Sequence, residues 1–407
     1  MIHYNLNKFF LLSLSKLFLV LCSLSSFGSD LNNSTIQNSS LIKQYMQEIK
    51  AENELVGLGV AIADSHRNSA VFVMGKRKVD GNEFIQRDDA WHIGSNTKAL
   101  TALLFSRLVE EGVVRWEQPI PSFFKDHQDK IDAAWEHQTI LDLFSHRSGL
   151  ERLGPTWILP TRFSDKSVIE LRDEDVQDFL FEPPSKKVGI WKYSNLNYII
   201  AGAAIEAALK EKHKAAISWE EAMLKYVFSL HPVSKAKQGW GFGPPKHIEG
   251  HKNSFWGFGS LNSVGKGSLA DNPASLGPAG TIHVPLESHA LLLTEFLQKD
   301  SHFLPDSQKK RLLSAYPDNS SDYALGWQVN EDPKLGQYYT HNGSNNMWLS
   351  YVIIAPEIDR IIIVNTNRAS NKILKSLKKF ALKLANPEFY FEGKFSQEGN
   401  LLTTDNQ

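Results

Sequence analysis

The chain has 407 residues, of which 42% are hydrophobic and 22% charged, with a formal net charge of -1. This is the composition of a globular protein long enough for one large or two medium domains. Acidic and basic residues nearly balance and are dispersed along the chain, which argues against a nucleic-acid partner and against an acidic tail.

Residues 1–28 have the pattern of a secretory signal. Lys8 and Lys16 are basic, residues 17–21 form the apolar centre, and small residues precede a cleavage site near Gly28. The apolar run is too short to cross a bilayer, and Lys16 interrupts any longer one. We therefore expect an exported protein, periplasmic or extracellular, with no stable membrane insertion after cleavage.

The only cysteine, Cys22, lies inside this signal. A lipoprotein signal has a small residue before its cysteine, and Leu21 fits that pattern poorly, so lipidation at Cys22 is the secondary alternative. Without Cys22 the mature chain has no disulfide, no thiol nucleophile and no zinc-thiolate site. Residues 29–40 are rich in Ser, Asn, Thr and Gln, which is typical of a flexible leader.

Strand patterns occupy both ends of the remaining chain. A helix is predicted over residues 41–52, and apolar runs at 55–63 and 70–74 predict two strands joined by a turn. More strands are predicted after residue 320, and an amphipathic helix follows them. These later strands cover residues 323–329, 337–341, 348–354 and 360–365, and the helix covers residues 370–385.

The middle of the chain is mostly helical in pattern, with long loops. Helices are predicted over residues 141–150, 174–181 and 196–210, and the stretch 232–280, rich in Gly, Pro, Ser and Trp, predicts a long loop of the kind that is often functional. Strands at both ends and helices between them predict an α+β fold, with a sheet domain interrupted by a helical domain. The predicted domains are residues 41–112 with 281–385 for the sheet and 113–280 for the helices, followed by a tail at 386–407.

The stretch from Ile93 to Gly112 carries the first chemical signal. Ser95 opens a predicted helix with an apolar face, and Lys98 lies one turn later on the same side. A serine hydroxyl needs a base to become a good nucleophile, and a desolvated neutral lysine amine can be that base. The same spacing occurs elsewhere in the chain, so this pair needs partners to be specific.

Tyr193-Ser194-Asn195, just before a predicted helix, supplies such partners. A phenol can pass a proton between nucleophile and leaving group, and an amide can bond both Lys98 and a substrate carbonyl. The alternative is a Ser-Asn pair that only caps the following helix.

A third motif is His341-Asn342-Gly343, followed by Ser344, at the end of a predicted strand. Gly343 lets a substrate approach the backbone closely, and the Ser344 N–H can pair with the Ser95 N–H as an oxyanion hole. The alternative is an ordinary hairpin, because the pattern is loose and recurs in the chain.

Together, in this order, the three motifs resemble the signature elements of the penicillin-recognising serine hydrolases, specifically the class C β-lactamase-like group with its D-Ala-D-Ala carboxypeptidases and esterases. The resemblance covers roughly residues 41–385 and includes the stretches 56–63, 145–150 and 276–281. It implies an antiparallel sheet flanked by helices plus an all-helical domain, in agreement with the pattern above.

The resemblance also implies roles for individual residues. Ser95 would be the acylated nucleophile, Lys98 and Tyr193 the proton-transfer pair, Asn195 a substrate-positioning amide, and His341 a residue that lines the site. Dedicated β-lactamases of the group carry lysine where this chain has His341, whereas its peptidases and esterases often carry histidine. We therefore expect ester or peptide-like substrates to be favoured over β-lactams. Arg368, beyond the last strand, is a candidate anchor for a substrate carboxylate; a solvated arginine is the alternative.

The main hypothesis is a secreted serine hydrolase acting by acyl transfer on a small-molecule or peptide substrate, without a cofactor. A true β-lactamase, and a catalytically inactive binding protein of the same fold, are the alternatives. Metal-dependent hydrolysis needs clustered ligands, and the loosely spaced pairs His247/His251 and His283/His289 are expected at the surface. No metal site is predicted.

Overall fold

The computed structural model describes residues 39–151, 153–254 and 259–387. The predicted signal, almost all of the leader and the tail beyond residue 387 lie outside these residues. One compact unit runs from Ile49 to Asn386. The preceding described residues belong to a separate unit, and residues 39–52 are helical, where a helix over 41–52 was predicted.

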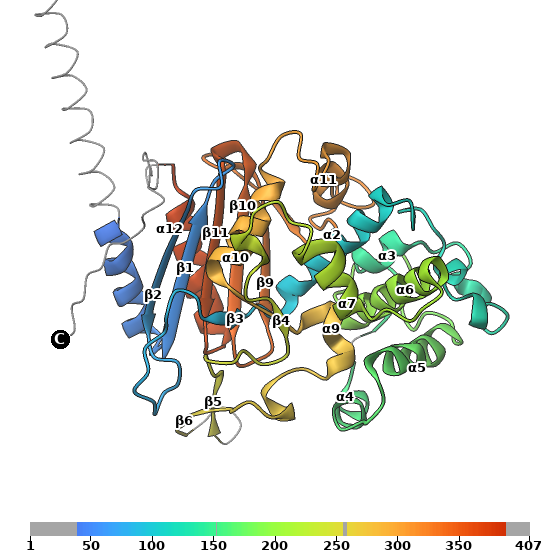
Figure 1. Cartoon of the computed structure of the whole chain (residues 1–407), viewed down its shortest axis with the longest axis horizontal. Coiled ribbons are helices and arrows are strands. Elements are labelled where there is room, and N and C mark those ends of the chain that lie inside the picture. Colours follow the sequence, from blue (N-terminus) through green and yellow to red (C-terminus); the bar gives the residue numbers. More distant parts are fainter. Residues whose placement is uncertain (1–38, 152, 255–258, 388–407) are drawn as a thin grey trace, which may run out of the picture. The chain divides into compact units, whose positions relative to one another are not determined.

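A six-stranded antiparallel sheet organises the unit, in the order β2-β1-β11-β10-β9-β8. Both ends of the chain contribute: β1 pairs with β11, with Val60 opposite Val364, and β10 pairs with β9, with Tyr351 opposite Asn342. Figure 1 shows the early and late strands side by side. The strands are β1 (Gly57–Ala63), β2 (Ser69–Gly75), β8 (Gln328–Asp332), β9 (Gly336–Ser344), β10 (Leu349–Ala355) and β11 (Arg360–Thr366).

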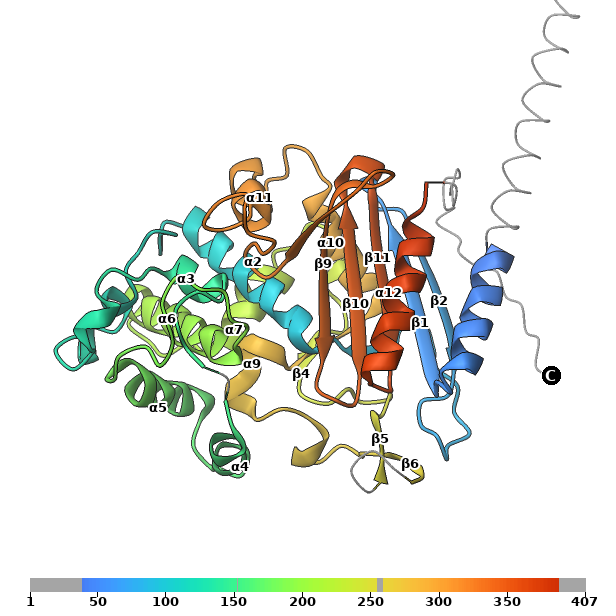
Figure 2. The same ribbon diagram turned by 180° about the vertical axis from the view of Figure 1, so that it is seen from behind.

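Helices cover both faces of this sheet. Every residue of β1, β10 and β11 is buried, and their sequences are nearly continuous runs of apolar residues, as expected for strands covered on two sides. The amphipathic helix α12 (Asn371–Ala385) lies on one face and α10 (Leu286–Leu293) on the other (Figures 1 and 2).

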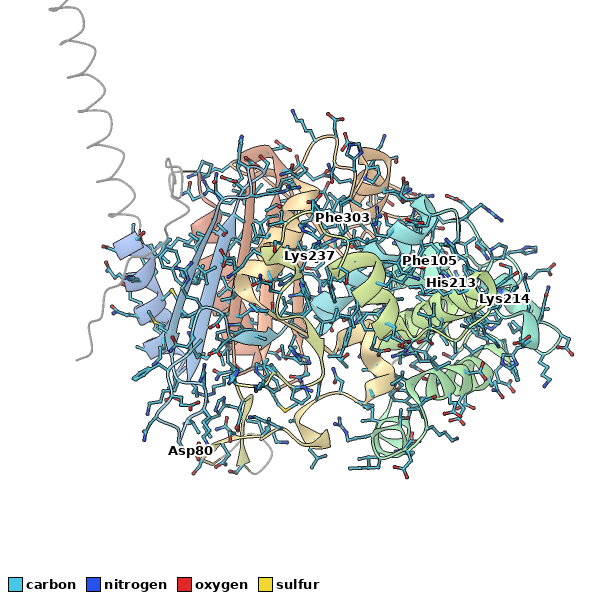
Figure 3. All side chains as sticks on the ribbon, in the orientation of Figure 1. Asp80, Phe105, His213, Lys214, Lys237 and Phe303 are labelled. Carbon is cyan, nitrogen blue, oxygen red and sulfur yellow. The ribbon has the colours of Figure 1, made fainter. Side chains whose placement is uncertain are left out.

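The helical part of the unit packs around two apolar helices. α2 (Thr97–Glu110) is buried along most of its length, and α6 (Asn195–His213) is buried from Leu196 to Glu206. Helices that are apolar on all sides belong in the core of a large domain. In Figure 3, Phe105 of α2 lies inside the unit, while Asp80 and Lys214 lie at its surface. The remaining helices are α3 (Ile140–Phe144), α4 (Pro155–Arg162), α5 (Val168–Leu180), α7 (Trp219–Met223), α9 (Gly277–Gly280) and α11 (Asp306–Leu313).

The stretch 232–280 is loop-rich, as predicted, with short elements in it. One small sheet lies within it and joins β5 (His251–Asn253) and β6 (Leu261–Ser263). In a second small sheet, β4 (Gly241–Phe242) of this stretch pairs with β7 (Ile282–Pro285), which also pairs with β3 (Ala90–His92). Among the described residues, no helix is both long and apolar enough to cross a membrane.

The predicted α+β fold, with an antiparallel sheet and helices, is confirmed. The strand predicted over 323–329 is wrong, because Gly326 adopts a φ of +88° in a turn against α2, and the strand begins only at Gln328. A Cβ at Gly326 would lie 2.7 Å from Ala99 Cα, so only glycine fits this turn. The helix predicted over 141–150 stops at Phe144, just before the left-handed residue His146.

The expectation of surface histidines is wrong for two of the four. His251 is 1% exposed: its Nε2 accepts a bond from Val79 N at 3.0 Å, and its Nδ1 bonds Asn367 O at 2.8 Å. His289 is equally buried beside Trp240. His251 therefore links two segments by hydrogen bonds, and His289 packs in the core.

Candidate active site

The nucleophile candidate Ser95 sits in a single 3-10 turn, Gly94–Asn96, that leads into α2. Two glycines let strand β9 approach this turn backbone to backbone. A Cβ at Gly94, whose φ is +51°, would lie 2.3 Å from Ser344 N, and one at Gly343 would lie 1.8 Å from Ile93 O and 2.8 Å from Ser95 N. The backbone amides of Ser95 and Ser344 are thereby brought to neighbouring positions, as an oxyanion hole requires.

Lys98 lies fully buried beneath Ser95. Its Nζ is 3.2 Å from Ser95 Oγ and donates hydrogen bonds to Asn195 Oδ1 and to Ala279 O, both at 2.7 Å. Burial without a carboxylate partner lowers the Lys98 pKa well below its usual value. A neutral amine has two N–H bonds, which match the two short acceptors, so its lone pair is left for the Ser95 proton.

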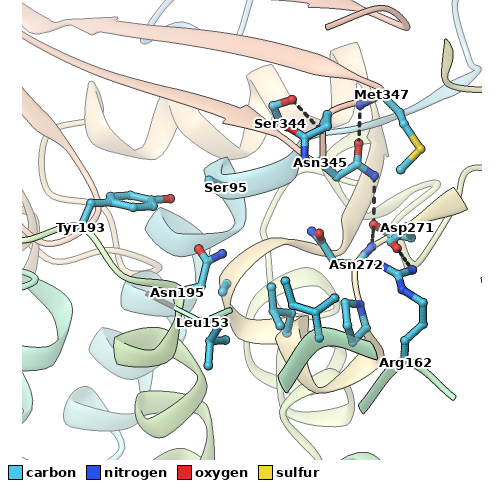
Figure 4. Close-up of a pocket in the computed structure, with 15 residues that line it drawn as sticks. Ser95, Leu153, Arg162, Tyr193, Asn195, Asp271, Asn272, Ser344, Asn345 and Met347 are labelled. Carbon is cyan, nitrogen blue, oxygen red and sulfur yellow. Dashed lines mark hydrogen bonds between the residues drawn. The ribbon is translucent and has the colours of Figure 1, made fainter. Parts of the chain in front are cut away.

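Aromatic rings surround this amine. Lys98 Nζ lies 4.9 Å from the Tyr193 ring centre and 5.5 Å from that of Tyr198. His146 packs on Tyr193 with ring centres 4.5 Å apart. These rings keep water from the amine, and they place the Tyr193 phenol on the nucleophile's side of the cavity (Figure 4).

His146 positions the Tyr193 segment. Its Nδ1 accepts a bond from Ser194 N at 3.3 Å, so the neutral ring carries its proton on Nε2. Burial, with the neighbouring Lys98, lowers the His146 pKa well below its usual value and keeps the ring uncharged. The imidazole therefore holds the backbone next to Tyr193 without adding charge to the site.

Asn195 is the first residue of α6, and the preceding residue caps that helix. Ser194 Oγ accepts from Leu196 N at 3.2 Å and donates to Glu151 O at 2.6 Å. The helix-capping alternative is therefore correct for Ser194, while the Asn195 side chain turns to Lys98 and the cavity. Neighbouring residues thus have different roles: Ser194 caps α6, and Asn195 contacts Lys98.

His341 lies in β9 behind the cavity wall, 5% exposed. Its Nδ1 lies 3.2 Å from Asn96 Oδ1, and its Nε2 lies 3.3 Å from Tyr323 Oη. Because the Asn96 amide donates to Ser350 Oγ at 2.8 Å, Asn96 Oδ1 accepts from His341 Nδ1–H, and Nε2 accepts from the tyrosine. Burial and Lys98 lower the His341 pKa to about 3, so the ring is neutral at physiological pH.

A cavity of about 440 Å³ opens beside Ser95 (Figure 4). Four of the predicted site residues line it: Ser95, Tyr193, Asn195 and Ser344. The rest of its wall comes from the α4 region, the 271–279 segment and the β9–β10 turn, namely Leu153, Ile158, Arg162, Asp271, Asn272, Pro273, Leu276, Ala279, Asn345, Asn346 and Met347.

Arg368 is not brought to this cavity. Its Nη1 donates to Glu54 O at 2.9 Å and lies 3.2 Å from Glu54 Oε2. Within residues 39–387, gaps aside, no cluster of three or more His, Cys, Asp or Glu side chains is arranged to hold a metal ion.

A family model described as "Beta-lactamase" matches residues 39–386. The chain belongs to the β-lactamase family.

Three proteins similar to this β-lactamase-family chain share 15–22% of its residues. Protein flp of Staphylococcus aureus (strain N315) is 22% identical over 381 residues, which cover 88% of this chain and 68% of flp. The octameric penicillin-binding protein homologue from Pyrococcus abyssi superposes with a TM-score of 0.67 and 20% identity, covering 86% of this chain and 78% of that one. A β-lactamase/D-alanine carboxypeptidase from Pseudomonas syringae gives 0.67 and 15%, covering 86% and 100%. These structures share the fold.

The sequence signals only some of the further residues at the site. His146 and the Ala279 carbonyl lie in the stretches 145–150 and 276–281, which resemble the family. Tyr323, Arg162 and Asp271 belong to no motif, because they reach the site only through long-range packing.

Proposed function

We propose that this chain is a serine hydrolase that forms an acyl-enzyme on Ser95. The observation that carries the proposal is the environment of Lys98: a desolvated amine, 3.2 Å from Ser95 Oγ, whose two N–H bonds are already taken by acceptors at 2.7 Å. An amine in this setting is a base in its resting state, which is what an unactivated serine needs.

The proposed reaction begins when Lys98 takes the Ser95 proton and Oγ attacks the substrate carbonyl. The negative charge on the carbonyl oxygen is stabilised by the Ser95 and Ser344 amides. As the bond to the leaving group breaks, the proton passes from Lys98 through the Tyr193 phenol to the leaving atom. Water then attacks the carbonyl carbon of the Ser95 ester, the bond from that carbon to Ser95 Oγ breaks, and a proton from the water passes to Oγ, which restores the serine and releases the acid.

Within this reaction we propose that esters and D-amino-acid peptides are better substrates than β-lactams. A lysine at position 341 would be a permanent cation able to hold a substrate carboxylate. His341 is neutral, buried and already bonded on both nitrogens. Strand β9 contains neither lysine nor arginine, so it offers no positive charge to a substrate carboxylate in place of the lysine.

A true β-lactamase and an inactive binding protein remain the competing functions. The names of the family and of the relatives above support hydrolysis of peptide or lactam bonds in general, and every position of the proposed proton path holds a competent residue. We favour an active enzyme for that reason.

A substrate panel tests the proposal. Purified protein should hydrolyse a short-chain p-nitrophenyl ester or a D-amino-acid peptide, and Ser95→Ala should abolish this while leaving the melting temperature unchanged. Nitrocefin hydrolysis faster than every ester and peptide would make β-lactamase the primary function. Absence of all Ser95-dependent turnover and labelling would favour the binding protein.

A further inference from the structure

We propose that Arg162, at the end of the cavity beside Ser95, recognises a carboxylate on the acyl part of the substrate. The inference rests on the proposed acyl-transfer function and adds a substrate class to it: esters or amides of acids that carry a second carboxylate.

Two positions decide which part of the substrate enters the cavity. The leaving atom must lie near Tyr193, which gives it a proton. Figure 4 shows Tyr193 on one side of Ser95, with Asp271 and Arg162 on the opposite side. The cavity that begins at Ser95 continues to these last two residues. The acyl chain, which points away from the leaving atom, therefore extends toward Arg162.

Arg162 and Asp271 are the charged residues among those that line this cavity. The Asp271 carboxylate is turned into the protein and is 4% exposed. Its Oδ1 accepts from Asn272 N at 2.6 Å and from Asn345 Nδ2 at 3.0 Å, and Oδ2 is fully buried.

His92 lies behind Asp271. Its Nδ1 accepts from Gly94 N at 3.1 Å, so the neutral ring carries its proton on Nε2, which lies 2.8 Å from Asp271 Oδ1. Lys98 lies beneath Ser95, and burial lowers its pKa well below its usual value. Among the residues that line the cavity, Arg162 is the basic one.

The Arg162 guanidinium is held in place by the backbone carbonyl of Asp271. Arg162 is the last residue of α4, and its Nη1 donates to Asp271 O. Asn345, which bonds the Asp271 carboxylate, follows Ser344 directly. Arg162 is thus linked to the turn that carries an oxyanion amide (Figure 4).

The cavity walls include apolar side chains, which strengthen electrostatic attraction inside the cavity. These side chains are Leu153, Ile158, Leu276 and Met347. Walls of low dielectric focus the field of a charge in a cleft and raise the local concentration of an oppositely charged ligand. A guanidinium also binds a carboxylate through two parallel hydrogen bonds, which fixes the orientation of the acyl chain.

The experiment compares two p-nitrophenyl esters of glutaric acid, one with its second carboxyl free and one with it as a methyl ester. Wild-type protein should show the higher kcat/KM for the free acid, and added salt should lower only this value. Arg162→Gln should lower kcat/KM for the free acid about tenfold more than for the methyl ester, mainly through KM. Arg162→Lys should retain part of the preference. Lys210→Gln, an exposed cation on α6 that lines a different cavity, is the matched control and should change neither ester.

Each outcome separates the inference from the function on which it rests. Equal use of both esters by wild-type protein, or an equal loss for both in Arg162→Gln, overturns the role of Arg162 while Ser95-dependent turnover upholds the hydrolase. If neither ester is turned over and Ser95 is not labelled by a phosphonate, the hydrolase proposal falls and the inference falls with it. Should Arg162→Gln melt early, Arg162→Lys and the salt dependence of wild-type protein decide.

Discussion

The proton path through Lys98 and Tyr193 makes a prediction about how their losses combine. Lys98→Ala removes the base next to Ser95, and Tyr193→Phe removes the hydroxyl that passes the proton on. Each should lower kcat/KM for an ester by about 100-fold, the scale of general acid–base catalysis, which equals about 2.7 kcal/mol of transition-state free energy. Since both groups serve one path, the double variant should lose little more than either single variant.

Lys98→Ala also has a structural consequence. It leaves Asn195 Oδ1 and Ala279 O without their 2.7 Å donor, and an unsatisfied buried acceptor costs about 1–3 kcal/mol. The burial penalty of the amine is relieved at the same time, so the two effects oppose each other. Melting temperatures therefore need to be measured beside the rates.

The assay is initial-rate hydrolysis of a p-nitrophenyl ester by the two single variants and the double variant. His146→Gln is the informative companion, because it disturbs the position of Tyr193 without removing either proton carrier. A double variant that loses about 10,000-fold, the product of two independent losses of about 100-fold, would refute a shared path.

Three further predictions rest on the same geometry, and a fourth rests on the sequence of residues 1–28. The kcat/KM of wild-type protein should rise with pH as Lys98 loses its proton, and it should level off well below the usual lysine pKa of 10.5. His341, with a pKa of about 3, should add no change between neutral and alkaline pH. A rise that continues to the usual lysine pKa would contradict a desolvated base. Gly343→Ala should destabilise the protein by about 1–3 kcal/mol and suppress turnover, because its Cβ would lie 1.8 Å from Ile93 O. The control Gly267→Ala, whose Cβ would have no atom within 4 Å, should change neither the melting temperature nor the rate. His341→Lys should slow ester turnover by placing a charge among buried groups, and an unchanged ester rate would argue against its place behind the wall. A fusion of residues 1–28 to a reporter should be exported; a reporter retained in the cytoplasm would contradict the signal, and palmitate incorporation at Cys22 would support the lipoprotein alternative.

Local spacing predicted the pairing of Ser95 with Lys98, because residues three apart lie on one face of a helix. Tyr193 and Asn195 flank Ser194, the residue that caps α6, and their roles came from the resemblance to the family. The structure then brings the two motifs together, with 2.7 Å between Lys98 Nζ and Asn195 Oδ1. Apolar runs at the two ends of the chain indicated a sheet built from both ends, and the resemblance to the family implied that its strands are antiparallel.

Other features depend on contacts that no local pattern encodes. Arg162 meets Asp271 across more than a hundred residues, and α4 itself has little helical signal because Pro160 lies inside it. The displaced start of β8 follows from the packing of Gly326 on α2. Arg368 was considered as an anchor from its position after a strand, but its guanidinium is directed to Glu54.

The central claim, an activated nucleophile at Ser95, is tested most directly by labelling. Intact protein is incubated with a fluorophosphonate at neutral pH, and the adduct is located by mass spectrometry of the peptides. The account predicts one adduct per chain, on Ser95, formed much more slowly in Lys98→Ala and absent in Ser95→Ala. An unlabelled wild-type protein, or an adduct on another residue with Ser95 unmodified, would contradict it.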